Sequence, residues 1–352
     1  MLVLGIETSC DENAIALVED GLRVRSNVVG SQVERHRPYG GVVPEIAARA
    51  HLELLLPCID RALVEGGCTY ADIDAVAVTR GPGLVGALLV GVAAAKGLAL
   101  AHGLPLIGVN HLEGHVCAVQ LEFGPLPTPL VALIVSGGHT SLVLLDTQGR
   151  FSTVGATIDD AAGEAFDKIA RFLGLPYPGG PEIDRLAREG DACAMAFPRA
   201  MPATLDFSFS GVKTAVIREL RRREAVGEPI HLPDVAASFQ EAVVDVAVRK
   251  TLVAARTHDV EHVTVVGGVA ANSRLRAAAA DACRREGLRL LLPAPGLCTD
   301  NGAMIAAAGA NRLLAGERSG LDIDADPNLP LEALAVAGEH ERGASPQGQA
   351  SS

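Results

Sequence analysis

The chain has no tryptophan, and its 3 tyrosines and 8 phenylalanines leave aromatic residues at only 3% of 352 positions. Hydrophobic residues still reach 49%, so the core must be built mainly from aliphatic side chains. Cations are also few, since the formal net charge is -12. This balance excludes a protein that coats nucleic acid nonspecifically, which would be basic. It does not exclude a nucleic-acid substrate held by a local patch or by a partner.

Paired cysteines and membrane segments are absent as well. The seven cysteines form no Cys-x-x-Cys motif and are odd in number, which favours a reducing cytosol. The N-terminus runs from Met1 to Glu7 without a basic region, so we expect no signal peptide. The apolar run from Gly81 to Ala95 is too short and too rich in glycine to span a bilayer. We therefore expect a cytoplasmic protein without membrane contact.

The order of the predicted elements repeats along the chain. Strands at 2–6 and 14–18 flank a polar turn, and strands at 130–135 and 141–145 flank a glycine turn. Each half then carries a strand, a glycine loop and a helix, and two such α/β halves imply a ligand cleft between them. We also predict strands at 24–32, 74–79, 106–109 and 262–266, helices at 44–64, 84–100 and 303–314, a helical region at 158–257, and a floppy tail after about 336.

The stretch from Asn110 to His115 carries the most specific chemistry. His111 and His115 lie one helical turn apart on the same face, and Asn110 is a good N-cap for a helix that continues through 116–121. Two neutral imidazoles at this spacing bind one divalent metal, or they are ordinary polar residues on a half-buried helix. A metalloprotease requires glutamate directly after the first histidine, but Leu112 stands there and Glu113 points off the metal face.

Asp300 lies just before the last predicted helix. An aspartate there is most often a simple N-cap. The alternative is a third ligand to the histidine pair. Two histidines and one carboxylate would leave coordination positions open for a substrate, as a catalytic metal needs.

Two glycine loops are candidates for holding a phosphate. Ser136-Gly137-Gly138 lies between two apolar strands, where successive N–H groups form an anion nest; the alternative is a plain hairpin turn. Gly267-Gly268 lies before a helix N-terminus, and its alternative is close helix–strand packing. Neither is a Walker loop, because no Gly-Lys-Ser/Thr follows. Asp167 is either a ribose acceptor or an exposed helix residue, and Gly179-Gly180 suits a flat base.

Taken together, the motifs resemble the bacterial TsaD family (older labels YgjD and Gcp), tRNA N6-adenosine threonylcarbamoyltransferase. They follow the family's order from residue 1 to about 330. The matching segments are residues 4–12, 39–45, 81–84, 111–115, 135–140, 158–168, 177–181, 207–213, 267–272 and 298–302.

The resemblance implies the two-lobed actin/sugar-kinase/Hsp70-like fold (ASKHA), an α/β architecture with duplicated mixed sheets flanked by helices and a cleft between the lobes. Related ATPases carry aspartate in the first hairpin, where this chain has Glu7. The expected domains are an N-terminal lobe at 1–129 completed by a C-terminal helix at about 303–330, and a second lobe at 130–302 with a helical insertion at about 158–257. A disordered tail is expected at 337–352.

The resemblance also implies a reaction. A family member passes a threonylcarbamoyl group from threonylcarbamoyl-adenylate to N6 of the adenosine 3′ of the anticodon, in tRNAs reading codons that begin with A, and AMP leaves. By the family's motif, the metal ligands are His111, His115 and Asp300, with Fe2+ expected and Zn or Mg as alternatives. The adenylate, whose place ATP, ADP or AMP can also take, is expected to bind Ile134, Val135, Ser136, Gly137, Gly138, Asp167, Gly180, Asp184 and Asn272.

The chemistry is acyl transfer from a mixed anhydride. A metal polarises the carbamoyl carbonyl or holds the phosphate, and positioning must assist the weakly nucleophilic N6 amine. Asp11 and Glu12 on the first turn are candidate proton acceptors, or a solvated acidic turn.

The resemblance further implies partners: a TsaB-like paralogue, a TsaE-like ATPase and an upstream TsaC-like synthase that makes the adenylate. These partners can supply contacts to the tRNA. On this chain the candidate basic patches are Arg221-Arg222-Arg223, Arg249-Lys250 and Arg284-Arg285.

Two other functions remain open from the residues. An ATP-dependent sugar or carboxylate kinase of the same fold would need an acidic base but no histidine pair with Asp300. A non-enzymatic nucleotide-binding scaffold would close on ATP without modifying tRNA. Bound metal in the purified protein distinguishes the transferase from the kinase.

Overall fold

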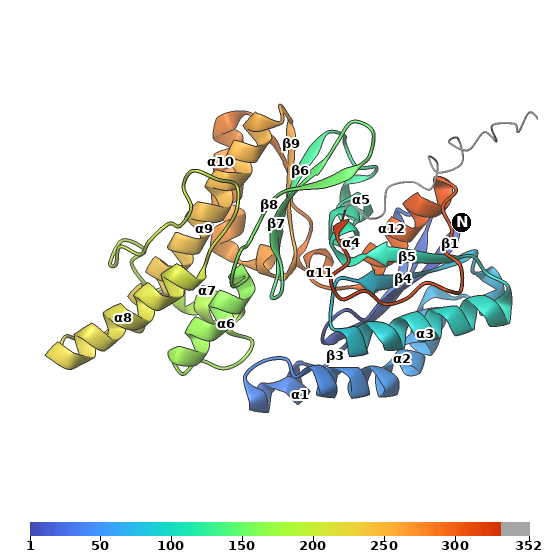
Figure 1. Ribbon diagram of the computed structural model, residues 1–352, viewed down its shortest axis with the longest axis horizontal. Helices are drawn as coiled ribbons and strands as arrows, with labels where there is room; N and C mark the ends of the chain where they lie inside the picture. The colour runs from blue at the N-terminus through green and yellow to red at the C-terminus, as the bar shows by residue number, and fades with distance from the viewer. Residues whose placement is uncertain (332–352) are drawn as a thin grey trace, which may run out of the picture.

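The computed structural model describes residues 1–331, which form two five-stranded sheets flanked by helices (Figure 1). The predicted tail at 337–352 lies outside the described residues. Both sheets are mixed, and their strand orders, β3-β2-β1-β4-β5 and β10-β9-β6-β7-β8, repeat one design. In each, a β-hairpin or meander of three antiparallel strands continues into parallel strands that follow later in the chain. The predicted duplication of an α/β architecture is therefore confirmed.

Four strands of the first sheet, β1, β2, β4 and β5, are buried on both faces and mainly apolar, whereas the edge strand β3 is largely exposed. Leu4 and Ile6 face a core with helices α2 and α3, whereas Val3 faces helix α12. This alternation follows from the two-residue period of a strand. The elements are β1 (Leu2–Glu7), β2 (Glu12–Glu19), β3 (Arg23–Ser31), β4 (Ala75–Gly81), β5 (Leu106–Asn110), α1 (Val33–His36), α2 (Pro44–Gly66), α3 (Val85–His102) and α12 (Gly302–Leu314).

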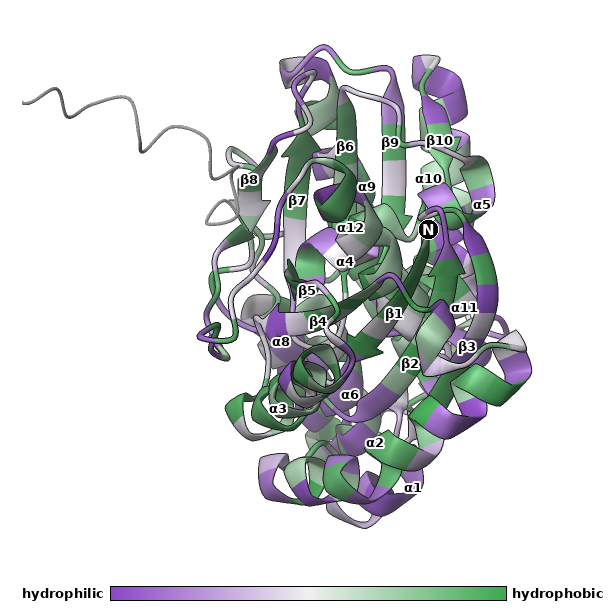
Figure 2. Cartoon of the chain, turned by 90° about the vertical axis from the view of Figure 1, so that its right-hand side faces the viewer, coloured by the Kyte–Doolittle hydropathy of each residue, from purple (hydrophilic) through white to green (hydrophobic). Residues whose placement is uncertain are grey.

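The second sheet is covered on one face by a larger helical layer. Phe166, Phe207, Phe209 and Phe239 are fully buried there and Phe197 is nearly so, which places five of the eight phenylalanines in this one core. Its elements are β6 (Leu130–Val135), β7 (Thr140–Leu145), β8 (Phe151–Ala156), β9 (His262–Val266), β10 (Arg289–Leu291), α6 (Ala162–Phe172), α7 (Gly179–Ala187), α8 (Ser210–Val226), α9 (Leu232–Thr257), α10 (Ser273–Glu286) and α11 (Pro295–Cys298). The strands are mainly hydrophobic and the outer helices are amphipathic (Figure 2).

Helix α4 (His111–Cys117) lies between the two sheets. Leu112 and Val116 pack against the second sheet, in a cluster with Ile134 and Val143. The predicted continuation of this helix through 116–121 is wrong, because α4 ends at Cys117 and a separate short helix, α5 (Gln120–Phe123), follows after a turn.

Two strands escaped the sequence prediction. β8 is half-exposed and weakly apolar, and it pairs with β7 at the edge of the second sheet. β10 has only three residues and is defined by its pairing with β9. Both are edge strands, whose identity depends on a neighbour and not on a local pattern.

Helix α3 is the only helix in residues 1–331 that is long and apolar enough to cross a membrane by length and composition. Its buried residues Val92, Ala95 and Ala99 pack in the same core as Leu4 and Ile6 of the first sheet. That packing places one face of α3 in the core, whereas Val85, Leu89 and Leu100 on the same helix are exposed.

Candidate functional site

The two histidines are fixed by the start of helix α4. The side-chain oxygen of Asn110 accepts a hydrogen bond from the backbone N–H of Leu112 at 2.9 Å, so the predicted N-cap is confirmed. His111 and His115 are both buried, and their ring centroids lie 4.7 Å apart. Glu113 points away from them, as the spacing predicted, and it forms a buried ion pair with Arg312 at 2.7 Å.

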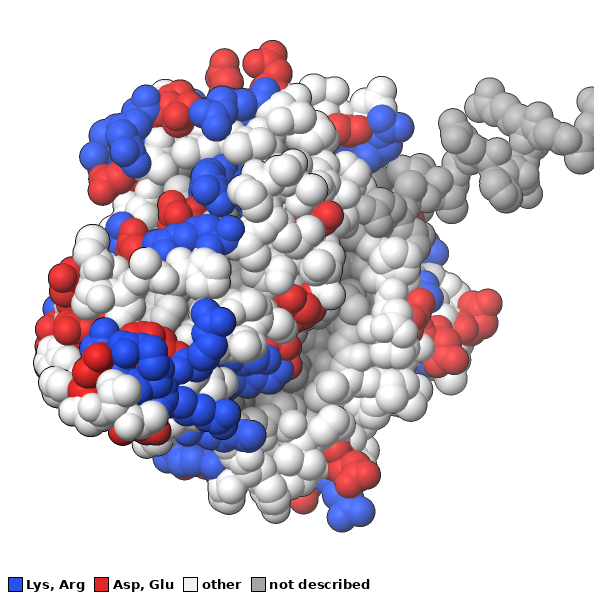
Figure 3. All heavy atoms as spheres, turned by 60° about the vertical axis from the view of Figure 1, so that its left-hand side comes forward, with Lys and Arg blue, Asp and Glu red and all other residues white. Residues whose placement is uncertain are grey.

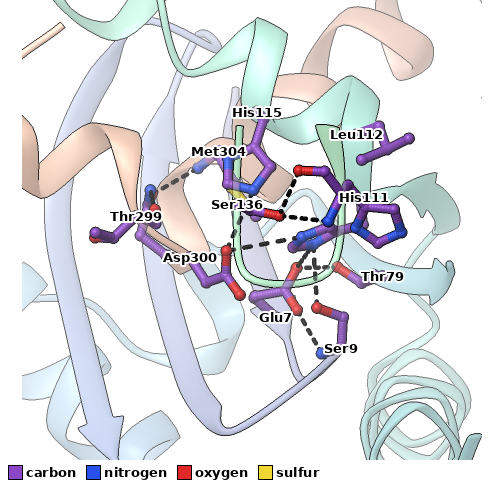
Figure 4. Close-up of polar contacts among 12 residues, drawn as sticks. Glu7, Ser9, Thr79, His111, Leu112, His115, Ser136, Thr299, Asp300 and Met304 are labelled. Carbon is purple, nitrogen blue, oxygen red and sulfur yellow. Dashed lines mark hydrogen bonds and ion pairs between the residues drawn. The ribbon is translucent and has the colours of Figure 1, made fainter. Parts of the chain in front are cut away.

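Asp300 completes the cluster (Figure 4). Its Oδ1 atom lies 3.2 Å from Nε2 of His115 and 3.7 Å from Nε2 of His111. The N-cap of α12 is Asn301, whose side-chain oxygen accepts from the N–H of Met304 at 2.9 Å. The alternative of Asp300 as an N-cap is therefore wrong, and its carboxylate is free to face the histidines.

Small residues bring α4 and α12 close enough for this meeting. A Cβ atom added to Gly114 would lie 2.7 Å from Cδ1 of Ile305, so the glycine lets the two helices touch. A Cβ on Gly302 would lie 2.5 Å from the backbone N of Ala16, so the start of α12 rests directly on β2. The position of Asp300 is thus set by close packing on the first sheet.

The donor atoms fit a metal ion. One ligand atom from each of His111, His115 and Asp300 lies within 4.8 Å of the others, the only such group of histidine, cysteine or acidic side chains found in residues 1–331. Both ring nitrogens of His115 are buried; Nε2 lies 3.2 Å from the Asp300 carboxylate, and Nδ1 has no hydrogen-bond partner within the described part of the chain. A buried polar nitrogen without a partner is costly unless something binds it, and two imidazoles with one carboxylate suit Fe(II) or Zn.

Glu7 contacts His111 at Nδ1, which is not the ring nitrogen that faces Asp300. Its Oε2 lies 3.0 Å from Nδ1 of His111 and accepts a hydrogen bond from the Thr79 hydroxyl at 2.6 Å. Ser9 Oγ also lies 3.1 Å from Nδ1 of His111. With Nδ1 engaged in this way, Nε2 of His111 is left facing Asp300 and the cluster.

The pKa values of Glu7, His111 and Asp300 depend on one another. Burial alone would raise the pKa of Glu7, but the neighbouring His111 imidazole holds that pKa below its ordinary value. Burial likewise works against a charged His111, yet the carboxylates of Glu7 and Asp300 raise its pKa to about 9. The pKa of Asp300 is lowered by His111 and His115 despite its burial. A cation at the cluster would take over the role of the imidazole protons.

Glu7 as a support of His111 and His139 as a neighbour of the site were not predicted from the sequence. The His139 ring lies 6.1 Å from that of His111, and burial lowers the pKa of His139 to about 4, so it is neutral. Its position directly after the glycine turn was the available signal.

A cavity of about 730 Å³ lies between the lobes and includes this site. First-lobe turns and second-lobe helices both contribute to its wall, as the duplicated architecture predicted. Its lining includes Asp11, Glu12, Gly40, His111, Ser136, Gly137, Gly138, His139, Asp167, Arg171, Tyr177 and Asp300.

Asp11 and Glu12 face this cavity from the turn between β1 and β2. Burial raises the pKa of Glu12 to about 7 and also raises the pKa of Asp11. One oxygen of Glu12 is buried without a hydrogen-bond partner in the described residues, while the other accepts from the Ser31 hydroxyl at 2.9 Å. The interpretation of this segment as a merely solvated turn is therefore wrong.

A second cavity of about 410 Å³ adjoins the first, and the two share Gly137, Asp167 and Gly268. Its wall also contains Gly180, Asp184 and Asn272. Glycines leave the backbone N–H groups of this wall open to a ligand.

Several predicted adenylate-binding side chains have other partners. Asn272 caps α10, since its side chain accepts from the N–H of Leu275 and donates to Gln240 at 2.7 Å. Asp184 accepts from the Ser273 hydroxyl at 2.8 Å and pairs with Arg188. Any contact from these residues to a ligand therefore uses remaining lone pairs or backbone groups.

Asp167 is half-buried and accepts from the N–H of Gly179 at 2.7 Å, so the interpretation as a freely exposed helix residue is wrong. Ile134 and Val135 are buried strand residues whose side chains line neither cavity. Only their backbone could reach a ligand.

Several cations of the predicted basic patches already bind groups of this chain. Lys250 is buried and donates to the carbonyls of Met201, Thr204 and Asp206. The prediction that it belongs to a basic surface patch is therefore wrong. Arg222 and Arg223 pair with Glu219, as Arg284 pairs with Asp281.

Comparison with known proteins identifies the relatives of the chain. Residues 23–307 match the model of the TsaD family, described as tRNA N6-adenosine threonylcarbamoyltransferase. A protein of that name from Geobacillus thermodenitrificans is 55% identical over 332 residues, which cover 94% of this chain and 96% of the relative. Another, from Moorella thermoacetica, is 54% identical over 331 residues, covering 94% and 97%.

Solved structures with the same fold are far more distant. The activator of 2-hydroxyisocaproyl-CoA dehydratase from Clostridium difficile, with bound ADPNP, aligns with a TM-score of 0.52 at 15% identity, covering 91% of this chain and 99% of the activator. HypF of T. kodakarensis aligns with a TM-score of 0.60 at 13% identity, covering 90% and 47%. The two-lobed ASKHA fold predicted from the sequence is confirmed.

Proposed function

The chain belongs to the tRNA N6-adenosine threonylcarbamoyltransferase family, and on that premise we propose that its cleft modifies tRNA. A threonylcarbamoyl group passes from threonylcarbamoyl-adenylate to N6 of the adenosine 3′ of the anticodon, in tRNAs reading codons that begin with A. The observation that supports this most strongly is the convergence of His111, His115 and Asp300, of which His111 and Asp300 line the cleft.

His111, His115 and Asp300 hold one divalent cation in this proposal. Fe2+ fits two imidazoles and one carboxylate; Zn is the nearer alternative, and Mg prefers an all-oxygen set. When bound, the cation supplies Lewis-acid stabilisation of negative charge on the carbamoyl oxygen or the phosphate. Glu7 fixes the orientation of His111 through Nδ1.

The donor lies across the two joined cavities. Its adenosine occupies the 410 Å³ cavity beside Gly180 and Asp184, and its anhydride reaches Ser136-Gly137-Gly138 and the metal cluster. The glycine turn offers N–H groups to the phosphate without adding a negative side chain. ATP, ADP and AMP share these groups and would occupy the same place.

In the transfer step, the N6 nitrogen bonds to the carbamoyl carbon and the bond from that carbon to the phosphate oxygen breaks. AMP leaves with the electron pair, and the proton lost from N6 passes to a carboxylate. Glu12 is suited to accept it, because its pKa of about 7 keeps it basic enough at neutral pH. Asp11 on the same turn is the alternative acceptor.

The protein works in the cytoplasm with partners in this proposal: a TsaB-like paralogue, a TsaE-like ATPase and a TsaC-like synthase that supplies the adenylate. The net charge of -12 supports this dependence, because tRNA binding by the chain alone must rely on local cations. The kinase and scaffold alternatives are disfavoured by family membership, and neither accounts for the histidine pair facing Asp300.

A reconstituted reaction tests the function. The metal-loaded protein and its partners are mixed with threonylcarbamoyl-adenylate and tRNA, and nucleosides are analysed by mass spectrometry. We expect threonylcarbamoyl-adenosine from the wild type and none from His111→Ala, with metal content lost in the variant. His102→Ala is the control, since His102 is exposed and lines neither cavity. Wild-type turnover by His111→Ala would refute the metal site.

A further inference from the structure

The outer mouth of the cleft carries a small cavity that the donor does not need. It has a volume of about 180 Å³ and is lined by Arg37, Gly40, Arg171 and Tyr177, together with Asp167. Gly40, Asp167, Arg171 and Tyr177 also line the large cavity of the metal cluster, so the two spaces adjoin. A molecule entering toward the metal cluster from this side passes the two arginines and the tyrosine.

Both lobes contribute to this mouth. A Cβ atom added to Gly40 would lie 3.3 Å from Cδ of Arg171, so the Arg171 stem of α6 covers the first-lobe loop. The Arg171 side chain is exposed and has no hydrogen-bond or ion-pair partner among residues 1–331. Arg37 pairs with Glu34 at 2.7 Å, but both side chains are more than half exposed, so this pair holds the guanidinium weakly.

Arg171 differs from the other cations near the cleft. Lys168 is bound by Asp160 and Glu164. Figure 3 shows basic side chains gathered beside the hollow between the lobes, on a protein whose net charge is -12. A free guanidinium at the mouth of an otherwise acidic protein is available to a phosphate.

Tyr177 is one of only 3 tyrosines in a chain without tryptophan. Its half-buried ring lies in the wall of both spaces. Burial and the carboxylates of Asp11 and Asp167 raise the pKa of its phenol, so the hydroxyl is neutral and close to the acidic turn. The ring is shared by the two spaces, of which the small one alone contains Arg37 and the large one alone contains Asp11 and Glu12.

This arrangement matches the polarity of a nucleotide in RNA. The phosphate is an anion that must remain outside with the RNA backbone, and the base is a flat ring that stacks on aromatic side chains. An exocyclic amine that loses a proton belongs beside carboxylates. Cations outside, an aromatic ring between and acids inside would orient an entering adenosine with N6 toward the metal cluster.

We propose that this mouth is the binding site for the acceptor nucleotide of the tRNA, with its base against Tyr177 and its phosphate on Arg171 and Arg37. The site is separate from that of the donor's adenosine, which occupies the 410 Å³ cavity in the proposed function, although Asp167 lines both spaces. This inference rests on the proposed function, because it specifies how the tRNA of that reaction is held. Extrusion of the base from the anticodon loop is inexpensive, since loop nucleotides are unpaired.

The test measures the two substrates separately, with metal-loaded protein, its partners, a full-length tRNA transcript and threonylcarbamoyl-adenylate. In Arg171→Ala we expect the KM for tRNA to rise about tenfold and the KM for the adenylate to stay within about twofold, as loss of one phosphate contact predicts. Arg171→Lys should recover part of the loss. Arg289→Ala, which removes an exposed cation of the second lobe outside these cavities, should match the wild type.

Two further readouts distinguish contact from a structural effect. The slope of log affinity for tRNA against log salt should fall by about 0.7 in Arg171→Ala, because one phosphate contact is lost. Tyr177→Ala should raise the KM for tRNA by about 5- to 150-fold, whereas Tyr177→Phe, which retains the stacking surface, should stay within about twofold. Metal content and the unfolding midpoint identify variants that fail to fold.

The outcomes distinguish the proposed function from the proposed binding site for the tRNA nucleotide. Wild-type protein that forms no threonylcarbamoyl-adenosine would overturn the proposed function and this inference with it. Wild-type turnover together with an unchanged tRNA KM and salt slope in Arg171→Ala would overturn the inference alone. An equal rise in the adenylate KM would also overturn it, because the mouth would then belong to the donor.

Discussion

The two hairpin turns that face the cleft occupy equivalent places in the two lobes but differ in chemistry. The turn between β1 and β2 carries Asp11 and is flanked by Glu7 and Glu12, whereas the turn between β6 and β7 is Ser136-Gly137-Gly138-His139 and holds no carboxylate. An anionic donor is repelled by the first turn and accepted by the second. One fold therefore supplies an acidic wall for proton transfer and a neutral wall for a phosphate.

The largest effect should come from removing the base of the acidic turn. We expect Glu12→Gln to lower kcat by about 10²- to 10⁴-fold, because a general base contributes rate enhancements of that order. In the wild type, the rate should rise with pH through about 7, where Glu12 ionises, and the variant should lose that rise. The measurement is kcat against pH with saturating substrates. A variant with the wild-type profile would assign the proton to Asp11 or another group.

The same substitution has a predicted sign for stability. Burial raises the folded-state pKa of Glu12 to about 7, so its stabilising contribution is present below its ordinary pKa and is lost as pH rises through 7. Glu12→Gln should therefore unfold at a higher temperature than the wild type at pH 8, and the difference should narrow toward pH 5. A thermal unfolding series checks this. A wider difference at low pH would contradict the burial of the carboxyl.

Glu7 belongs to the same wall but acts through His111. We expect Glu7→Gln to weaken metal affinity by about 10- to 100-fold, as loss of the carboxylate behind a metal-binding histidine generally does. The amide can still accept from Nδ1, so Glu7→Ala should lose more. Metal titration followed by a chelator competition measures both, with Glu34→Gln as an exposed control. Equal affinity in all three would show that His111 needs no support from Glu7.

The sequence predicted most of the fold because strands and helices here have strong local patterns. Residues 2–6 and Leu130–Val135 are apolar throughout, and Asn110 and Asn301 are good N-cap residues at helix starts. β8 was missed because its pattern is half-exposed and only its pairing with β7 defines it. The local sequence contains no information about that neighbour.

For the site, residue types were predictable but their partners were not. Asp300 had two possible roles from the sequence, and the structure separates them because Asn301 caps the helix. Glu7 touches His111 across 104 positions of the chain, a contact that no helical or strand period encodes. Lys250 looked like a surface cation beside Arg249, yet its ammonium is buried under three carbonyl groups.

The neutral wall should respond to a change of shape and not of charge. A Cβ atom on Gly163 would lie 2.6 Å from the carbonyl oxygen of Ser136 and 2.9 Å from the N of Gly137, so Gly163→Ala must displace the turn. Because the turn binds the donor phosphate in our proposal, we expect a rise of about tenfold in the adenylate KM, a misplacement worth about 1.4 kcal/mol. The KM for tRNA should change little.

Gly97→Ala in α3 is the matched control, since a Cβ there meets nothing within 4 Å. Separate titrations of adenylate and tRNA measure the effect. Gly163→Ala could instead lower kcat and alter its pH profile without changing the adenylate KM. That result would contradict the assignment of proton transfer to the acidic turn and phosphate binding to the glycine turn. The glycine turn would then share in proton transfer, and the neutral His139 that follows it would be the group to examine.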